Sequence, residues 1–167
     1  MAFYSRFQAK ALLFVACLVV TVPTGCRKSA PLENKTLRMQ LIHEIRDHSY
    51  DKAVPTARRL IELTPQDNFV WKKLVQAQFG LHDLDGAKQT LVEWRKTVRS
   101  PASRLDEYEG DLANKRHDSV RARQAWDKVL AAQPKNRRVL KKIALYEQSQ
   151  RRWAEAITAW SRLLNLS

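Results

Sequence analysis

The chain has 167 residues, which is enough for one domain but not for two once an N-terminal targeting segment is set aside. Thirty residues are Lys or Arg and 17 are Asp or Glu, so the formal net charge at pH 7 is +13. Such an excess predicts attraction to anionic partners and says nothing about the fold. The sequence has no HExxH, GxSxG or CxxC motif and no glycine-rich phosphate loop, so it predicts no enzyme, no cofactor and no metal site.

The first 25 residues are typical of a targeting segment. Positively charged residues precede an apolar run at 11–22, which is shorter than the roughly 20 residues that span a membrane. The run leads into the sequence PTGC, and the small residues before Cys26 resemble the lipobox of bacterial lipoproteins, although Pro23 stands where leucine is expected. We therefore predict a lipoprotein-type signal peptide at 1–25, lipid modification of Cys26 and a tether at 26–34. A plain secretory signal and an uncleaved anchor are the alternatives.

Export changes the partners that the positive charge predicts. A lipid on Cys26 would hold the chain at a membrane surface of the bacterial cell envelope. By the lipoprotein sorting rule, Arg27 after the cysteine favours the outer membrane, facing the periplasm. An exported chain rarely meets nucleic acid, so acidic proteins, anionic lipid head groups and cell-wall polymers are the expected partners.

From Lys35 onward the apolar residues recur at helical spacing. The repeat is marked by four alanines 34, 35 and 34 residues apart, at Ala53, Ala87, Ala122 and Ala156. An all-α protein is predicted, with eight helices at 35–47, 50–64, 67–80, 84–98, 102–115, 118–132, 136–149 and 152–165. A repeat of this length is one helix hairpin, which buries its apolar face only against its neighbours, so the hairpins should stack into a solenoid.

These repeats resemble the tetratricopeptide repeat (TPR), whose first helix carries W-x2-L-G-x2-Y and whose second carries A-x3-F and a closing proline. Signature positions are held by Trp71, Leu74, Val75, Ala87 and Leu91 in the second repeat, by Gly110, Ala122, Trp126 and Pro134 in the third, and by Leu140, Ala144, Ala156 and Trp160 in the fourth. The resemblance implies a TPR domain at 35–167. It also implies a right-handed α-α superhelix of four hairpins, at roughly 35–66, 67–101, 102–135 and 136–167.

The tryptophans are predicted to be core rather than a ligand cage. Trp71, Trp126, Trp153 and Trp160 fall on signature positions, where they fill the space between hairpins. Trp94 stands where the family usually has a small residue. We expect it to repack the junction between the second and third repeats, with a slight break in superhelical curvature there.

Three histidines recur with the repeat, which suggests a metal site or a pH switch. His48, His82 and His117 are 34 and 35 residues apart. In register they fall in the turn inside each hairpin, where the family commonly has a left-handed glycine, and histidine is enriched at positive φ. Successive hairpins lie about 10 Å apart, whereas zinc requires about 2.1 Å to each nitrogen. We therefore predict turns and no metal site.

The resemblance implies that the first helices line a concave, partner-binding groove. The inward-facing residues in register are Arg38, Arg46, Lys72, Lys73, Gln76, Tyr108, Lys115, Arg138, Lys141 and Lys142. Two pairs in the second and fourth repeats, Lys72 with Gln76 and Arg138 with Lys142, partly resemble the clamp by which some family members hold a C-terminal carboxylate. Tyr108 stands where that clamp has asparagine.

The acidic residues Glu107, Glu109 and Asp111 are predicted to be solvated surface charge. The leading expectation is a non-catalytic envelope scaffold that binds a protein or peptide, either acidic or through its C-terminal carboxylate. The alternative is a protein that binds anionic lipid or cell-wall polymer, or an assembly factor for pili, outer-membrane proteins or cytochromes. Apolar residues in the last helix, such as Leu163 and Leu164, also allow a homo-oligomer.

Overall fold

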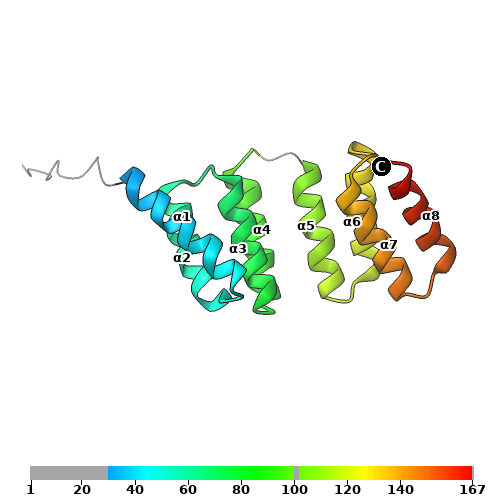
Figure 1. Cartoon of the computed structure of the whole chain (residues 1–167), viewed down its shortest axis with the longest axis horizontal. Helices are drawn as coiled ribbons and strands as arrows, with labels where there is room; N and C mark the ends of the chain where they lie inside the picture. The colour runs from blue at the N-terminus through cyan, green and yellow to red at the C-terminus, as the bar shows by residue number, and fades with distance from the viewer. Residues whose placement is uncertain (1–29, 100–101, 167) are drawn as a thin grey trace, which may run out of the picture.

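The structure, a computed structural model, describes residues 30–99 and 102–166, and in this part of the chain four helix hairpins follow one another along the long axis (Figure 1). The helices are α1 (Ala30–Arg46), α2 (Tyr50–Leu63), α3 (Asn68–Gly80), α4 (Leu84–Thr97), α5 (Ala102–Lys115), α6 (Ser119–Ala132), α7 (Arg137–Ser149) and α8 (Trp153–Leu164). The all-α solenoid that the repeats predict is confirmed. The predicted signal peptide at 1–25 and the lipidation site at Cys26 lie outside the described residues. None of the helices described is both long enough and apolar enough to cross a bilayer.

Helices α2 to α8 agree with the predicted bounds to within one residue at each end. The exception is α1, which begins at Ala30, inside the segment expected to be a tether. Glu33 lies in its first turn, where a carboxylate interacts favourably with the positive end of the helix dipole. Its Oε1 lies 3.3 Å from Nη2 of Arg59 on α2. The helix therefore extends further toward the N-terminus than the apolar pattern predicts.

Polar side chains define where four of the helices start. The residues before α3, α4, α6 and α7 each accept a hydrogen bond from a backbone N–H of the first turn; they are Asp67, Asp83, Asp118 and Asn136. Asp67 and Asn136 cap the first helices of the second and fourth repeats, and Asp83 and Asp118 cap the second helices of the second and third.

One left-handed residue lies in the turn inside each hairpin. His48, His82 and His117 have φ of 59°, 57° and 60°, so the prediction that the histidines form turns is confirmed. The fourth hairpin has Arg151 at this position, with φ of 60°. Among the described residues, no cluster of His, Cys, Asp and Glu is arranged to hold a metal ion.

Small residues let the helices of each hairpin approach closely. The signature alanines Ala53, Ala87 and Ala122 have no exposed surface. In the third repeat α5 also carries Gly110, and a Cβ on this glycine would lie 2.4 Å from Nε1 of Trp126. The glycine is required here because the indole of α6 lies directly against the backbone of α5.

Trp71 and Trp126 are buried, as predicted, and Trp94 is buried as well. Trp94 of α4 packs on Tyr108 of α5, with 5.5 Å between ring centroids, and its Nε1 donates to Oδ1 of Asn68 at 2.9 Å. Trp94 therefore does join the second repeat to the third, while the break in curvature at this junction stays a prediction.

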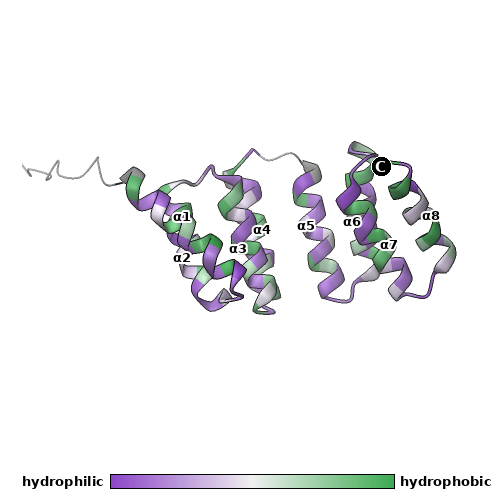
Figure 2. Ribbon diagram, viewed as in Figure 1, coloured by the Kyte–Doolittle hydropathy of each residue, from purple (hydrophilic) through white to green (hydrophobic). Residues whose placement is uncertain are grey.

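The prediction was wrong for Trp153, whose surface is 58% exposed. The equivalent residue of the first hairpin, Tyr50, packs its ring against Gly80 of the following repeat. No repeat follows Trp153 within the described residues, so nothing covers it. Figure 2 shows hydrophobic (green) segments on α8 at this end of the solenoid. Trp160 packs partly buried against the core cluster formed by α6 and α7.

Candidate functional site

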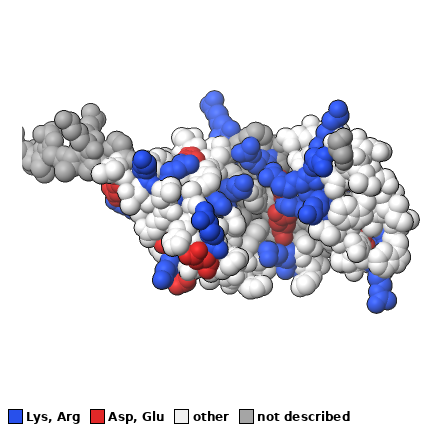
Figure 3. All heavy atoms as spheres, viewed as in Figure 1, with Lys and Arg blue, Asp and Glu red and all other residues white. Residues whose placement is uncertain are grey.

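All ten predicted groove residues lie on the first helices of the hairpins, namely α1, α3, α5 and α7. We refer to the surface that these residues form as the groove face. Lys and Arg side chains (blue) gather over α5 and α7 on the side of the molecule seen in Figure 3, with Asp or Glu side chains (red) among them. The two halves of the groove face, α1 with α3 and α5 with α7, differ in how their charges are compensated.

In the C-terminal half two of the cations, Arg138 and Lys142, are paired with carboxylates. Glu107 of α5 is only 3% exposed, and it accepts hydrogen bonds from Arg138 Nη2 at 2.8 Å and from Lys142 Nζ at 2.7 Å. Lys142 also pairs with Asp111, whose other oxygen accepts from Trp126 Nε1 at 3.3 Å. The prediction of solvated surface charge is therefore wrong for Glu107 and Asp111, because basic residues of the following repeat cover them.

Burial shifts the pKa values of two acidic groups in this half, Asp111 and Tyr108. It raises the pKa of Asp111, since desolvation of the carboxylate outweighs the attraction of Lys142. It also raises the pKa of the Tyr108 phenol, to which the negative charge of Glu107 adds. The two cations of the clamp-like pair in the fourth repeat, Arg138 and Lys142, thus already hold a carboxylate from their own chain.

In the N-terminal half an aromatic ring lies close to two of the cations. Two cations lie near the ring of Phe69 of α3: the guanidinium carbon of Arg38 is 4.7 Å from the ring centroid and Nζ of Lys73 is 5.6 Å from it. Arg38 also pairs with Asp67. One cation on this ring is therefore neutralised and the other is not.

Lys72 and Lys73 form an uncompensated pair on α3. Neither makes an ion pair with any residue that the structure describes, and Lys73 only donates to Oε1 of Gln76 at 3.2 Å. The pKa of Lys73 is lowered first by burial and then by the positive charge of Lys72. Burial penalises the charged form of Lys73 and Lys72 adds repulsion, so an anion placed beside the two lysines would be favourable.

A hollow of about 460 Å³ lies between α3, α5 and α7. Phe79 and the half-exposed Leu145 are part of its lining, and Nζ of Lys115 lies 5.5 Å from the centroid of the Phe79 ring. The remaining predicted residues, Arg46 and Lys141, are exposed and form no ion pair within the described part of the chain.

The sequence reasoning missed the apolar residues of the groove face. Phe69 lies three residues before Lys72, and Phe79 lies three residues after Gln76. Because residues three apart share a helix face, the helical spacing that selected the lysine and the glutamine also selects the two phenylalanines. A pattern of charged and amide side chains alone does not select them.

The arrangement of the hairpins is that of solved repeat structures. The crystal structure of MamA superposes with a TM-score of 0.63 at 16% sequence identity, covering 83% of this chain and 81% of that one. The C-terminal part of a TPR repeat-containing protein from Cytophaga hutchinsonii gives a TM-score of 0.57 at 15% identity. That match covers 76% of this chain, which spans only 50% of the Cytophaga structure. No sequence model of a protein family matches the chain, and no curated protein matches it. The protein thus has a TPR-like helical-repeat fold.

Proposed function

We propose that the protein is a non-catalytic scaffold of the bacterial envelope that binds an acidic segment of a partner protein along its groove face. The observation that carries this proposal is the uncompensated pair Lys72 and Lys73. A carboxylate placed between the two ammonium groups would offset their repulsion and return the pKa of Lys73 toward its ordinary value. Such charge-assisted hydrogen bonds are stronger than those between neutral groups.

The apolar part of the groove face suggests how the segment continues. Phe69 flanks the lysine pair on one side, and the hollow beside Phe79 and Leu145 lies toward the C-terminal half. A segment that alternates acidic and apolar residues would place carboxylates on the lysines and apolar side chains on the rings.

The partner's C-terminal carboxylate is not the favoured ligand at the clamp-like pair Arg138 and Lys142. A C-terminus would have to displace Glu107, which is buried and hydrogen-bonded to both cations. Removing the cations from Glu107 would leave a buried, unpaired carboxylate, which is costly. We therefore propose recognition of an internal acidic segment, for which a free C-terminus is not needed.

A binding titration tests the groove. The probe is a synthetic peptide that alternates Glu with Leu or Val, and the variant is Lys72→Glu/Lys73→Glu. The control, Lys52→Glu/Lys96→Glu, makes the same change of charge at exposed positions on α2 and α4. We expect the groove variant to bind about tenfold more weakly or worse and the control to change affinity by less than about threefold.

Equal losses in the two variants would mean that net charge, not the groove, attracts the peptide. That result would favour the alternative function, binding of anionic lipid or wall polymer. The same two variants are therefore also tested on vesicles containing anionic lipid, where the alternative predicts equal, salt-sensitive losses. Lys142 is unsuitable for charge reversal because its partner Glu107 is buried.

The proposed location rests on the sequence around Cys26. Mass spectrometry of the protein purified from its own membranes measures the processed N-terminus. A mature chain that begins at Cys26 and carries acyl groups supports the anchor. A chain cleaved elsewhere without acyl groups favours a plain secretory signal, and an intact N-terminus favours the uncleaved anchor.

A further inference from the structure

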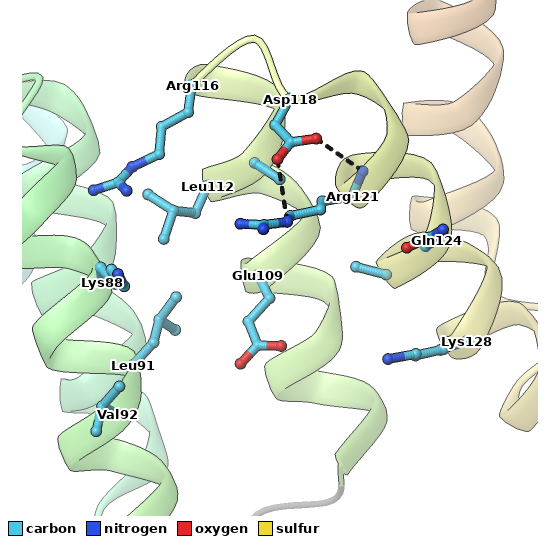
Figure 4. A pocket seen from close by; sticks show the side chains of 12 residues that line it. Lys88, Leu91, Val92, Glu109, Leu112, Arg116, Asp118, Arg121, Gln124 and Lys128 are labelled. Atoms are coloured by element: carbon cyan, nitrogen blue, oxygen red, sulfur yellow. Dashed lines mark hydrogen bonds and ion pairs between the residues drawn. The ribbon is translucent and has the colours of Figure 1, made fainter.

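A cleft of about 550 Å³ lies between the second helices α4 and α6, with α5 as its floor (Figure 4). Its lining comes from successive turns of two of these helices: Glu109, Leu112 and Arg116 of α5, and Arg121, Gln124 and Lys128 of α6. Residues three or four apart share one face of a helix. The cleft is thus bounded by continuous helix faces, which is the shape of a seat for one more helix.

The base of the cleft is apolar, and its walls combine apolar or small residues with charged ones. Leu91 and Leu112 are almost fully buried at its base, while Val92 on the α4 wall is 47% exposed. Ala113 of the floor and Ala125 of the α6 wall are small. The corresponding space between α6 and α8, at the next junction, has about 130 Å³. The junction between the second and third repeats is therefore much more open than the one that follows it.

The charges around the cleft favour an acidic occupant. Four Lys or Arg and two Asp or Glu line it. Both carboxylates, Glu109 and Asp118, are already paired with arginines. Lys88 and Lys128 form no ion pair with the described residues, and they extend from opposite walls (Figure 4). A cleft with an apolar base and an unpaired cation on each wall is complementary to an apolar stripe flanked by acids.

We infer that this cleft binds an amphipathic acidic helix of a partner protein, at a surface separate from the groove face. Apolar side chains of the partner helix, at helical spacing, would contact Val92, Ala113 and Ala125. Acidic side chains beside that stripe would pair with Lys88 and Lys128. The volume lies within the ~300–1,000 Å³ typical of ligand sites, so it accommodates one face of a short helix. Binding here does not depend on the groove proposal.

The test uses a synthetic helical peptide of about four turns, ~14 residues, with Leu at positions i, i+3, i+4 and i+7 and Glu on both sides of this stripe. Two peptides serve as controls. One has the same composition with the stripe scrambled, and the other has Lys in place of each Glu. We expect the acidic amphipathic peptide to bind at least about tenfold more tightly than either control. Equal affinity for the scrambled peptide, or no measurable binding, would overturn the inference.

Protein variants locate the peptide. Lys88→Glu/Lys128→Glu is expected to weaken binding about tenfold or more. Ala125→Trp leaves the charge unchanged and fills the cleft, and the same loss is expected. The groove variant Lys72→Glu/Lys73→Glu should retain its affinity for this peptide to within about threefold. Circular dichroism confirms that each variant is folded. If the groove variant loses binding while both cleft variants keep it, the peptide binds the groove face and the inference is wrong.

Discussion

Nζ of Lys142 lies 2.7 Å from Oε1 of Glu107, and this ion pair joins the first helix of the fourth repeat to the first helix of the third. Glu107 is buried while Lys142 is partly exposed, so the lysine brings the counter-charge to a carboxylate that water scarcely reaches. Arg138 and Lys142 are therefore compensated by carboxylates, whereas Lys72 and Lys73 of α3 form no ion pair with the described residues.

Replacing Lys142 should destabilise the fold. In Lys142→Met the buried carboxylate of Glu107 keeps only Arg138, so we expect the free energy of unfolding to fall by about 2 kcal/mol. Urea denaturation measures the change. Lys141→Met is the control, because Lys141 is exposed and forms no ion pair within the described residues. For this variant a change below about 0.5 kcal/mol is expected. Equal effects would show that the pair with Glu107 contributes nothing.

The stability contributed by Asp111 should depend on pH. Burial raises the pKa of Asp111 in the folded protein, so the folded state binds this proton more tightly than the unfolded state does. The favourable contribution is therefore present below the unfolded pKa and is lost as the pH rises through the folded value. In Asp111→Asn this titration is absent, while the amide oxygen can still accept from Trp126. Between about pH 7 and pH 4, the stability of the wild type relative to the variant should rise as the pH falls. A difference that stays constant or shrinks would contradict the raised pKa.

The sequence predicts the local features of this fold well and the contacts between repeats poorly. Alanine spacing and left-handed histidines belong to single hairpins, so their pattern is readable along the chain. The burial of Glu107 depends on Arg138 and Lys142, which lie 31 and 35 residues further on. A charged residue on a helix looks the same in the sequence whether water or the next repeat covers it. Trp153 shows the converse, because a signature position is buried only where another hairpin packs on it.

The left-handed turn at His82 gives a simple test of backbone strain. Its φ is 57° and its side chain is exposed. A non-glycine residue in this conformation destabilises the folded state by about 1 kcal/mol. Glycine removes this strain, but its greater freedom in the unfolded chain offsets part of the gain. His82→Gly should therefore raise the free energy of unfolding by about 0.5 kcal/mol, and β-branched His82→Val should lower it. His48→Gly should gain less stability, because Nδ1 of His48 lies 2.7 Å from the Tyr50 hydroxyl and this contact would be lost.

The histidines should not bind zinc. Added zinc should leave the unfolding midpoint of the protein unchanged, and a rise in that midpoint would restore the metal hypothesis.

Gly110 should resist replacement even though it lies inside a helix. Alanine favours helix over glycine by about 1 kcal/mol at an open position. At position 110 the added methyl would lie 2.4 Å from Nε1 of Trp126, an indole that is buried and cannot move aside freely. We expect Gly110→Ala to reduce the free energy of unfolding by about 1–3 kcal/mol. Asn114→Ala, at an exposed position on the same helix, is the control and should be neutral or slightly stabilising. A stabilised Gly110→Ala variant would mean that the contact with Trp126 is looser than the structure indicates.

The outer face of α8 should promote self-association. Ile157 and Leu164 are 64% and 70% exposed, and with Trp153 they follow one another at helical spacing. Contiguous exposed apolar surface marks interaction sites. We expect sedimentation velocity to detect association that increases with protein concentration and that Ile157→Glu abolishes. Val120→Glu is a matched control, since Val120 on α6 is also 64% exposed but lies away from this face. If Val120→Glu reduces association as much as Ile157→Glu does, general hydrophobicity and not the face of α8 drives it. A protein that stays monomeric at every concentration would contradict the prediction outright.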